Sequence, residues 1–484
     1  MNLLAWSQPK MLRTFLKDSV IYAIPAFVSR GLSLFLIPLY IRMLSPADYG
    51  SLDLLMVFAN LVNLTIALEV SQGVARFYSD ASDKAYKVAY ASSAFWFTVF
   101  CYSLFMVLAL SYSNTLSVWV MGRSGLKVTF QIGTVYIVLN GIFYLIQNQF
   151  RWELRSKHYG IVSLSVAFST AVAALVFIYR LRWGLEGLLL GQVFGALVGV
   201  IYGLWHLRKS FRFHFNVARL REMLAFSFPL VPSGIAVFIS TYIDRLMINY
   251  FLSVEDVGIY GLGFRLASII GLVIVGFQGA LTPLIYSHHR KIDTPHQLAQ
   301  IFRIFLAFAL FFYLALALFS RNILLIFSPP EYYGAAEIVP FLGLAILLMN
   351  MYIFAPGISI TKKTHIILWI NIMGAILNSF LNWFLIPLLG IFGAALATCI
   401  GSACVFIFYM LFSQKLYFVP HKFLKLVFAA ALSVILALVG TQISTFLGFD
   451  IVIKLMLLTI FVTTVFKIGL ISMSEITSAT KFLR

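Results

Sequence analysis

The heptapeptide LSPADYG, which begins at Leu44, recurs 208 residues later as LSVEDVG, which begins at Leu252. Each copy follows a long apolar segment and precedes another. The segment GLEGLLL from Gly184 matches GIFGAAL from Gly390, and LRSK matches ITKK more weakly, both at an offset of 206 residues. Three matches at a nearly constant spacing predict an internally duplicated membrane protein, and duplication of this kind is typical of transporters.

The amino-acid composition excludes a soluble protein. Of the 484 residues, 61% are hydrophobic and 11% are charged, so a water-soluble fold would have too little polar surface. The three cysteines have neither disulfide nor metal-ligand spacing, and His288, His289 and His296 are interpreted as solvated interfacial side chains. We therefore expect no metal and no other cofactor. The net charge of +18 is spread over short segments, which favours anionic membrane lipids over nucleic acid as a partner.

Fourteen segments are apolar over about twenty residues, the length that crosses the hydrocarbon core of a bilayer. They lie at roughly 19–42, 52–75, 89–112, 127–150, 160–180, 184–207, 223–251, 258–286, 300–324, 336–360, 366–389, 391–414, 423–446 and 449–473. Six spans separate the two copies of the repeated motif, and an even number makes both repeats point the same way through the membrane. We predict an all-α polytopic fold with two parallel six-helix repeats and two additional C-terminal helices.

The connecting segments predict the domain organisation and the topology. An N-terminal lobe of residues 1–207 and a C-terminal lobe of residues 223–416 are joined by a basic linker of residues 208–222, and residues 417–484 form the two additional helices. The connections on one side hold 24 Lys and Arg residues, whereas the other side holds seven, including Lys454. Because basic residues favour the cytoplasmic side, we expect a protein of the inner or plasma membrane with both termini cytoplasmic.

Arginines within the predicted spans are the strongest local indication of function, because a charge at the centre of a span costs roughly 2.5–3.5 kcal/mol. Arg30 lies near the middle of the first span and has no acidic residue near it in the sequence. Arg76 lies at the inner end of the second span, Arg245 towards the outer end of the seventh, and Arg265 early in the eighth. A guanidinium binds phosphate oxygens through two parallel donors and keeps its charge, so these arginines predict a cationic path for a diphosphate.

Two acidic residues accompany the arginines. Glu69 lies in the inner part of the second span, on the helical face of Arg76, and Asp244 directly precedes Arg245. Either carboxylate could tune the arginines or carry a coupling proton. A second interpretation is that Asp244 pairs with Arg245 or Arg265 and only fixes helix packing.

A ridge of asparagines follows one face of the eleventh predicted span. Asn371, Asn378 and Asn382 recur at i, i+7 and i+11, within about 40° of one another on a helix. Such a ridge would either line an aqueous cleft and bind sugar hydroxyls, or hydrogen-bond to neighbouring helices. The pattern leaves both interpretations open.

Several stretches resemble a known family. They are the run from Lys17 through Gly50, FSFPLVPSGIAVFISTYIDRLMINYFLSVEDVGIYGLGFRLA from Phe226, AAEIVPFLGLAILLMNMY from Ala335, and ILNSFLNWFLIPLLGIFGAALAT from Ile376. Together they resemble polysaccharide transporters, the Wzx-type oligosaccharide flippases of the multidrug/oligosaccharidyl-lipid/polysaccharide (MOP) superfamily. The resemblance covers nearly the whole chain through diffuse patterns, so it indicates the superfamily more specifically than the substrate.

The resemblance implies two six-helix lobes around a central cleft that opens alternately to each side of the membrane. The cargo would be a polyprenyl-diphosphate-linked oligosaccharide, which moves from the cytoplasmic to the outer leaflet for biosynthesis of O-antigen, capsule, teichoic acid or a similar surface polymer. Arg30, Arg76 and Arg265 occupy places comparable to the cleft arginines of related lipid II flippases. A polysaccharide polymerase and other assembly proteins would be partners, and a proton or sodium gradient could drive transport.

Two other classes of protein compete with the flippase interpretation. A cation-coupled multidrug exporter of the same superfamily would favour acidic residues in the cleft, where arginines are in the majority here. A membrane polysaccharide polymerase or glycosyltransferase would need catalytic groups on a sizeable outer loop, and the predicted outer loops are short. Among their few carboxylates, Asp48 and Asp256 occupy equivalent repeat positions, so we expect them to cap the following helices.

Overall fold

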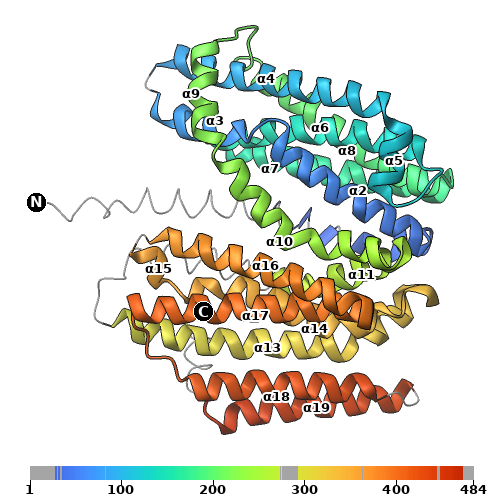
Figure 1. Cartoon of the computed structure of the whole chain (residues 1–484), viewed down its shortest axis with the longest axis vertical. Helices are drawn as coiled ribbons and strands as arrows, with labels where there is room; N and C mark the ends of the chain where they lie inside the picture. Colours follow the sequence, from blue (N-terminus) through green and yellow to red (C-terminus); the bar gives the residue numbers. More distant parts are fainter. Residues whose placement is uncertain are drawn as a thin grey trace, which may run out of the picture. The chain divides into compact units, whose positions relative to one another are not determined.

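The computed structural model describes most of the chain, and the regular structure within that part is helical (Figure 1). The described residues are 25, 28–29, 31–32, 35–81, 83–272, 274, 293–361, 363–443 and 447–471. The chain divides into two compact units, Met1–Phe238 and Ile239–Arg484, and each has its own helix packing. This all-helical, multi-pass architecture confirms the fold class predicted from the sequence.

The helices of the first unit are packed as a bundle. They are α2 Pro46–Thr65, α3 Val70–Asp80, α4 Lys84–Ser111, α5 Ser113–Met121, α6 Lys127–Trp152, α7 Ser156–Leu175 with the π-turn η1 Val176–Arg180, α8 Gly184–Leu207 and α9 Val217–Ser227. Helix α10 (Leu230–Phe251) leads from this unit into the second.

The second unit contains the following helices among the described residues. They are α11 Val254–Ala267, α13 Thr294–Phe327, η2 Pro330–Tyr332, α14 Ala335–Asn350, η3 Met351–Phe354, α15 Gly357–Ile360, α16 Thr364–Leu389, α17 Ile391–Leu416, α18 Phe423–Gln442 and α19 Leu447–Lys467. Its core is a continuous apolar cluster centred on α13, with buried side chains such as Phe305, Leu310 and Tyr313.

Eleven helices of the described part are long and apolar enough to cross a membrane, and the count reaches 12 when the bent pair α2–α3 is taken as one span. These helices coincide with twelve of the fourteen predicted spans. The two other predictions, at 19–42 and 258–286, lie partly outside the described residues.

The repeated heptapeptide begins a helix in each unit in the same way. The hydroxyl of Ser45 accepts a hydrogen bond from the backbone N–H of Asp48 (3.2 Å), and that of Ser253 accepts one from Asp256 (3.1 Å). Both aspartates in turn accept a hydrogen bond from the serine hydroxyl, and Asp48 completes a capping box with the backbone of Ser45. The N-cap residues are thus Ser45 and Ser253; the predicted capping role is confirmed for Asp48, whereas Asp256 binds only the hydroxyl of the capping serine.

The second repeated motif also starts a helix in each unit. Gly184 and Gly390 have φ angles of +51° and +62°, a region that glycine adopts without steric cost. A Cβ on Gly393 would lie 2.1 Å from the carbonyl oxygen of Leu385, so glycine is required for the close approach there.

The two units repeat one scheme of helix packing. In the first unit α6 packs against α4 and α8, and α7 packs against α8. In the second unit α14 packs correspondingly against α13 and α17, and α16 packs against α17. The shared neighbours support the duplication inferred from the sequence motifs.

Three predicted spans are interrupted in the structure, and the tenth, predicted over 336–360, is divided into α14, η3 and α15. The second, predicted as one helix over 52–75, bends by 45° where Leu68 and Glu69 adopt φ angles of +49° and +52°. The seventh, predicted over 223–251, is divided into α9 and α10 at Pro229, which has no N–H for the helix ladder. In the second and seventh spans the apolar character continues through the break, so hydropathy alone did not reveal it.

The predicted basic linker packs on the first unit. The hydroxyl of Ser92 donates to the carbonyl of Ser210 (2.8 Å) and accepts from the N–H of Arg212 (2.9 Å), and Ser93 accepts from Asn216 (2.9 Å). Helix α9 then packs against α3 and α4. The boundary between the two compact units therefore lies within α10, between Phe238 and Ile239. The predicted lobe boundaries at 207, 223 and 416 stay a prediction.

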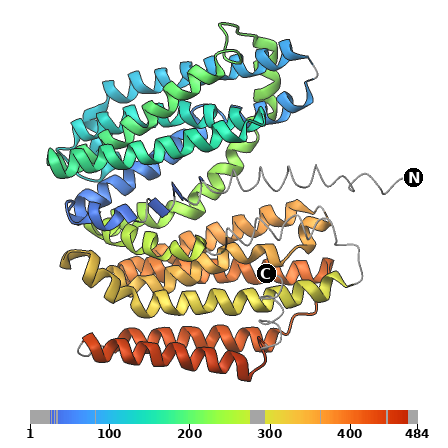
Figure 2. The same ribbon diagram turned by 180° about the vertical axis from the view of Figure 1, so that it is seen from behind.

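The two additional helices form a pair on the second unit, where α18 and α19 both pack against α13 (Figure 2). A buried polar cluster joins α19 to α13. The ammonium of Lys454 donates to Asn322 (2.6 Å) and to Asp450 (2.8 Å), and the Asn322 amide donates to Asp450 (2.9 Å). Lys454, which the sequence placed on the outer side, is 2% exposed, and Asp450 is 6% exposed.

Removing one member of this cluster should weaken the attachment of α19. We expect Asp450→Ala to lower the free energy of unfolding by about 3 kcal/mol, because the Lys454 ammonium would remain buried without its counter-charge. The thermal midpoint of the purified protein would report the loss. The exposed pair Arg76–Asp80 is the matched control, and Asp80→Ala should cost less than about 1 kcal/mol. Equal midpoints for the two variants would contradict a structural role for the cluster.

Candidate functional site

The predicted arginines lie in different environments. Arg30 lies outside the described residues. Arg76 lies on α3 with 57% of its side chain exposed, and its guanidinium forms an ion pair with Asp80 (2.8 Å) one turn further on. Arg265 lies on α11 and is half-buried.

Asp244 and Arg245 form a buried ion pair on α10. Both residues are 3% exposed, and the guanidinium Nη1 lies 3.0 Å from Oδ1 of Asp244. The other carboxylate oxygen accepts a hydrogen bond from the hydroxyl of Tyr260, on α11. The Arg245 guanidinium also lies over the ring of Phe264, 4.4 Å from its centroid. Of the two partners that the sequence suggested for Asp244, the structure pairs it with Arg245.

Tyr260 connects this pair to the asparagine ridge. Its hydroxyl lies 3.5 Å from Oγ1 of Thr398 on α17, which in turn lies 3.5 Å from the amide nitrogen of Asn378 on α16. The amide of Asn382 donates to the side-chain oxygen (3.0 Å) and the backbone carbonyl (2.9 Å) of Asn378. Two features that lie far apart in the sequence thus belong to one polar chain within the second unit.

This chain, which we call the α10–α17 polar network, consists of Arg245, Asp244, Tyr260, Thr398, Asn378 and Asn382. Asn382 is fully buried, and its Oδ1 has no hydrogen-bond partner among the described residues. A network of this kind in an apolar helix bundle is costly, and in membrane proteins such groups commonly mark a transport pathway. The third member of the predicted ridge, Asn371, lies apart from it and accepts a 3.4 Å hydrogen bond from Tyr409.

Tyr260 and Thr398 escaped the sequence analysis because neither is charged and each is surrounded by apolar and small residues. A usable signal was available for Tyr260. A tyrosine predicted to be inside a membrane helix needs a partner for its hydroxyl, and Asp244 is the acidic residue of the preceding span.

Glu69 marks a second polar location, in the first unit. It lies at the bend between α2 and α3, where its backbone adopts a left-handed conformation (φ +52°) that is unusual for a residue other than glycine. The backbone N–H of Gln72 donates to the carbonyl oxygen of Glu69 (2.8 Å), and Tyr102 and Tyr144 lie near its carboxylate. Tyr102 also donates to Oδ1 of Asn63 (2.8 Å).

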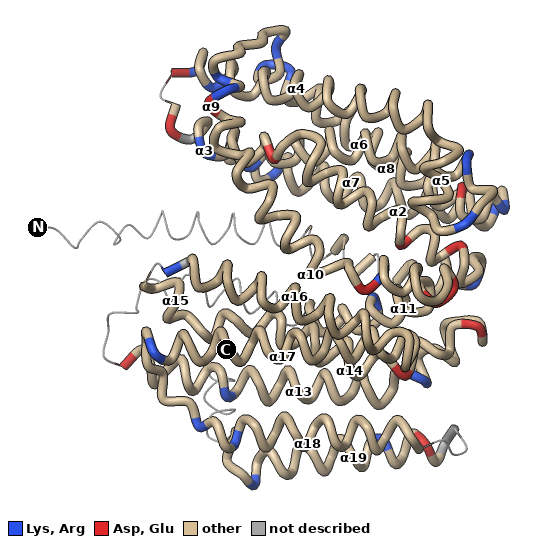
Figure 3. Tube along the Cα trace, viewed as in Figure 1, with Lys and Arg blue, Asp and Glu red and all other residues tan. Residues whose placement is uncertain are grey.

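Most charges of each unit lie near the ends of its helices, whereas the middle sections are largely uncharged (Figure 3). Glu222, on α9, is an example of a charge near a helix end that is paired with neighbouring side chains. Its carboxylate accepts hydrogen bonds from Tyr90 (2.6 Å) and from Arg219 (2.9 Å), and these bonds lower the pKa of Glu222 below its ordinary value. The Asp244–Arg245 pair on α10 departs from this distribution because it is buried within a span, as is the Asp450–Lys454 pair on α19.

Comparison with curated proteins identifies two distant relatives. The chain is 22% identical over 280 residues to the Lsg locus putative protein 1 of Haemophilus influenzae, and 23% identical over 283 residues to an uncharacterized membrane protein of the same species. Each alignment covers 56% of this chain and 65% of the relative. The chain therefore matches less than two thirds of these relatives.

Comparison with solved structures shows a shared fold. A lipid II flippase MurJ in an inward closed conformation aligns with a TM-score of 0.70 over 93% of this chain and 99% of that protein, at 16% identity. A multidrug resistance MATE family transporter of the MOP superfamily, in an inward-facing conformation, aligns with a TM-score of 0.64 over 82% of this chain and 97% of that protein, at 13% identity.

Two family models match the sequence. The MatE model matches residues 229–384, and the polysaccharide biosynthesis protein model matches residues 15–289. The second match extends over more than half of the chain and agrees with the resemblance noted in the sequence. The chain belongs to the polysaccharide biosynthesis protein family, and it has the multi-pass fold of the MOP superfamily.

Proposed function

We propose that the protein is a flippase that moves a polyprenyl-diphosphate-linked oligosaccharide from the cytoplasmic to the outer leaflet by alternating access. The membrane would be the inner or plasma membrane, with both termini cytoplasmic, and the product would feed a cell-surface polymer. The family match over residues 15–289 carries this proposal. It relates the chain to polysaccharide biosynthesis, and the same chain contains helices long and apolar enough to cross a membrane. Lipid-linked sugars are the polysaccharide intermediates that have to cross a membrane.

Arg30, Arg76, Arg245 and Arg265 would form the cationic path for the diphosphate. Arg245 has a specific role in this proposal, because its guanidinium already binds a carboxylate in a buried place. The diphosphate would compete with Asp244 for the same donors, since phosphate and carboxylate oxygens both accept bidentate hydrogen bonds from arginine. Tyr260 would keep Asp244 in position while Arg245 is engaged with cargo.

Asp244 and Glu69 are the candidates for coupling transport to a proton or sodium gradient. Asp244 lies beside Arg245, so protonation of its carboxylate would release the guanidinium for cargo. Glu69 lies at a bend, where a change of charge would act on the hinge between α2 and α3. Asn371, Asn378 and Asn382 would contribute amides for sugar hydroxyls as α16 moves.

Deletion of the gene in its native host tests this function. We expect the surface polymer to fall and the lipid-linked oligosaccharide to accumulate, as measured by immunoblot of the polymer and mass spectrometry of extracted lipids. A plasmid copy should restore both. Unchanged polymer and unchanged lipid-linked sugar in the deletion strain would contradict the proposal.

A second candidate function is export of cationic drugs, which the MatE match over residues 229–384 favours. An exporter would lower the accumulation of a fluorescent cationic dye such as ethidium in cells that overproduce the protein. The flippase proposal expects dye accumulation to equal that of the empty-vector strain, so the two functions give opposite results in one assay.

A further inference from the structure

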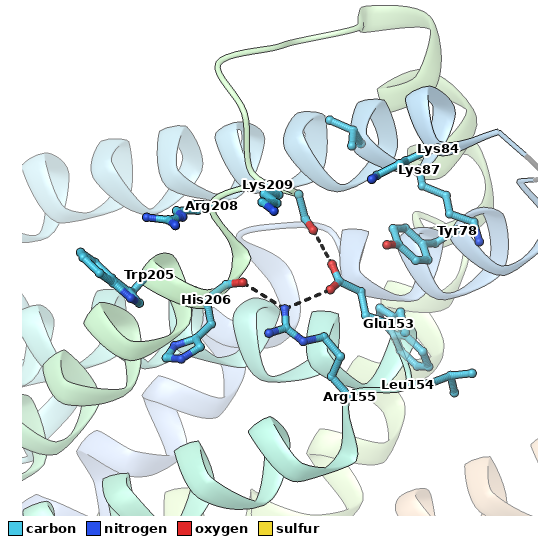
Figure 4. A pocket seen from close by; sticks show the side chains of 13 residues that line it. Tyr78, Lys84, Lys87, Glu153, Leu154, Arg155, Trp205, His206, Arg208 and Lys209 are labelled. Atoms are coloured by element: carbon cyan, nitrogen blue, oxygen red, sulfur yellow. Dashed lines mark hydrogen bonds and ion pairs between the residues drawn. The ribbon is translucent and has the colours of Figure 1, made fainter.

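A cavity of about 610 Å³ lies at one end of the first unit, among the ends of several helices (Figure 4). Its walls come from the end of α3, the start of α4, the turn between α6 and α7, and the end of α8. The charge bias of the sequence predicts this end to be cytoplasmic. The cavity lies entirely within the first unit and does not include any of the predicted cargo-binding residues.

Positive charge dominates the cavity. Its lining includes the basic residues Lys84, Lys87, Arg155, Arg208 and Lys209, against one carboxylate, that of Glu153. These side chains come from α4, from the α6–α7 turn and from α8 and its C-terminal end, so three separate segments bring them together (Figure 4). Among the described residues of the lining, the one carboxylate can neutralise only one of these five positive charges.

The base of the cavity is held in place by local hydrogen bonds. Nη1 of Arg155 donates to the backbone carbonyl of His206 (3.0 Å) and contacts the carboxylate of Glu153 (3.4 Å), and the guanidinium lies 5.3 Å from the ring centroid of Phe150. Glu153 also accepts hydrogen bonds from Ser210 and from Gln149. These bonds engage Glu153 and leave the lysines and Arg208 to determine which ligand enters.

The rim of the cavity is apolar. Trp205 and Leu154 are 68% and 82% exposed, and the guanidinium of Arg208 lies 5.4 Å from the ring centroid of Trp205. Exposed tryptophan beside basic residues is typical of the boundary between lipid headgroups and acyl chains. A ligand with a phosphate at one end and hydrocarbon at the other would satisfy both parts of this surface.

We propose that this cavity binds the phosphate headgroup of an anionic glycerophospholipid, with the acyl chains lying along Trp205 and Leu154. Basic pockets between membrane helices on the cytoplasmic side are suited to such headgroups. The bound lipid would join the ends of α4, α6 and α8, and it is independent of the cargo that the protein transports.

Native mass spectrometry of the full-length protein in mild detergent tests this site, with phosphatidylglycerol and phosphatidylcholine as the probes. We expect wild type to retain phosphatidylglycerol preferentially. The variant K84Q/K87Q/R208Q/K209Q should reduce that preference by about tenfold or more, since each basic residue contributes to the attraction. The matched control K127Q/R180Q/K415Q/K422Q removes the same charge from exposed positions outside the cavity and should behave as wild type.

Three results would overturn the proposal. They are an unchanged preference in the cavity variant, an equal loss in the control variant, and displacement of the lipid by millimolar pyrophosphate, which would make a soluble phosphate the ligand. If the fourfold variant does not yield folded protein, the pairs K84Q/K87Q and R208Q/K209Q are measured separately. Each pair should lower the preference, and two pairs without effect would also reject the site.

Discussion

Asp244→Ala is expected to cause a severe loss of folded protein. The substitution would leave Arg245 buried without its counter-charge, which typically costs about 3–5 kcal/mol. It would also remove the acceptor of the Tyr260 hydroxyl. Size-exclusion chromatography of a fluorescent fusion and the thermal midpoint of the purified protein would measure the loss. Tyr260→Phe removes the hydrogen bond to the Asp244 carboxylate and the weak 3.5 Å contact with Thr398, and should cost about 1.5–3 kcal/mol.

A double variant separates packing from transport at this pair. Asp244→Leu with Arg245→Met replaces both charges by apolar groups, and such replacements of buried ion pairs are often neutral for stability. We expect this variant to accumulate near the wild-type level and to lose transport, because Arg245 would no longer bind the diphosphate. Wild-type transport by the double variant would mean that the pair only fixes helix packing.

Arg30→Ala is expected to abolish transport while folded protein remains in the membrane. The prediction rests on the sequence, since Arg30 lies near the middle of the first predicted span and outside the described residues. Placing an arginine at the centre of a membrane helix costs roughly 2.5–3.5 kcal/mol. The presence of Arg30 at such a depth therefore indicates a function. Arg30→Lys should restore transport only in part, because lysine keeps the charge and loses the two parallel donors.

The control for Arg30 is Arg180→Ala, at the exposed end of η1. It should leave surface polymer unchanged. Complementation of a deletion strain, with protein amounts checked by immunoblot, compares the variants directly. If Arg30→Ala accumulates normally and restores the wild-type amount of polymer, the arginine does not belong to a cationic path.

The membrane helices could be predicted well because hydropathy follows from single residues. The predicted span at 184–207 coincides with α8. The predicted span at 391–414 begins with α17 at Ile391 and ends two residues before the end of that helix. Asp48 of the repeated heptapeptide acts through local capping, so its role could be predicted too, whereas the capping serines were not recognised. The bend at Leu68 and Glu69 could not be predicted, because these residue types ordinarily continue a helix and rarely adopt the left-handed conformation found there.

The candidate site was predicted only in part, for a related reason. Asp244 and Arg245 attracted attention because charges in apolar spans are rare, but the sequence left Arg245 and Arg265 as alternative partners of Asp244, and the structure shows the pair with Arg245. The hydrogen bonds from Tyr260 to Asp244 and from Asn378 to Thr398 join different helices, and helix rotation is not encoded in a local pattern. The basic cavity was missed because its residues come from segments far apart in the chain, each of which looks like an ordinary solvated helix end.

The central claim is that the protein translocates a diphosphate-linked lipid, and reconstitution tests it most directly. Purified protein would be placed in vesicles that contain a polyprenyl diphosphate carrying a fluorescently labelled disaccharide, and external dithionite would quench the accessible label. Wild-type vesicles should lose nearly all fluorescence as inner-leaflet lipid is exposed, whereas Arg30→Ala vesicles should lose only the outer-leaflet fraction. Loss of only that fraction in wild-type vesicles, or equal loss in both, would contradict the account.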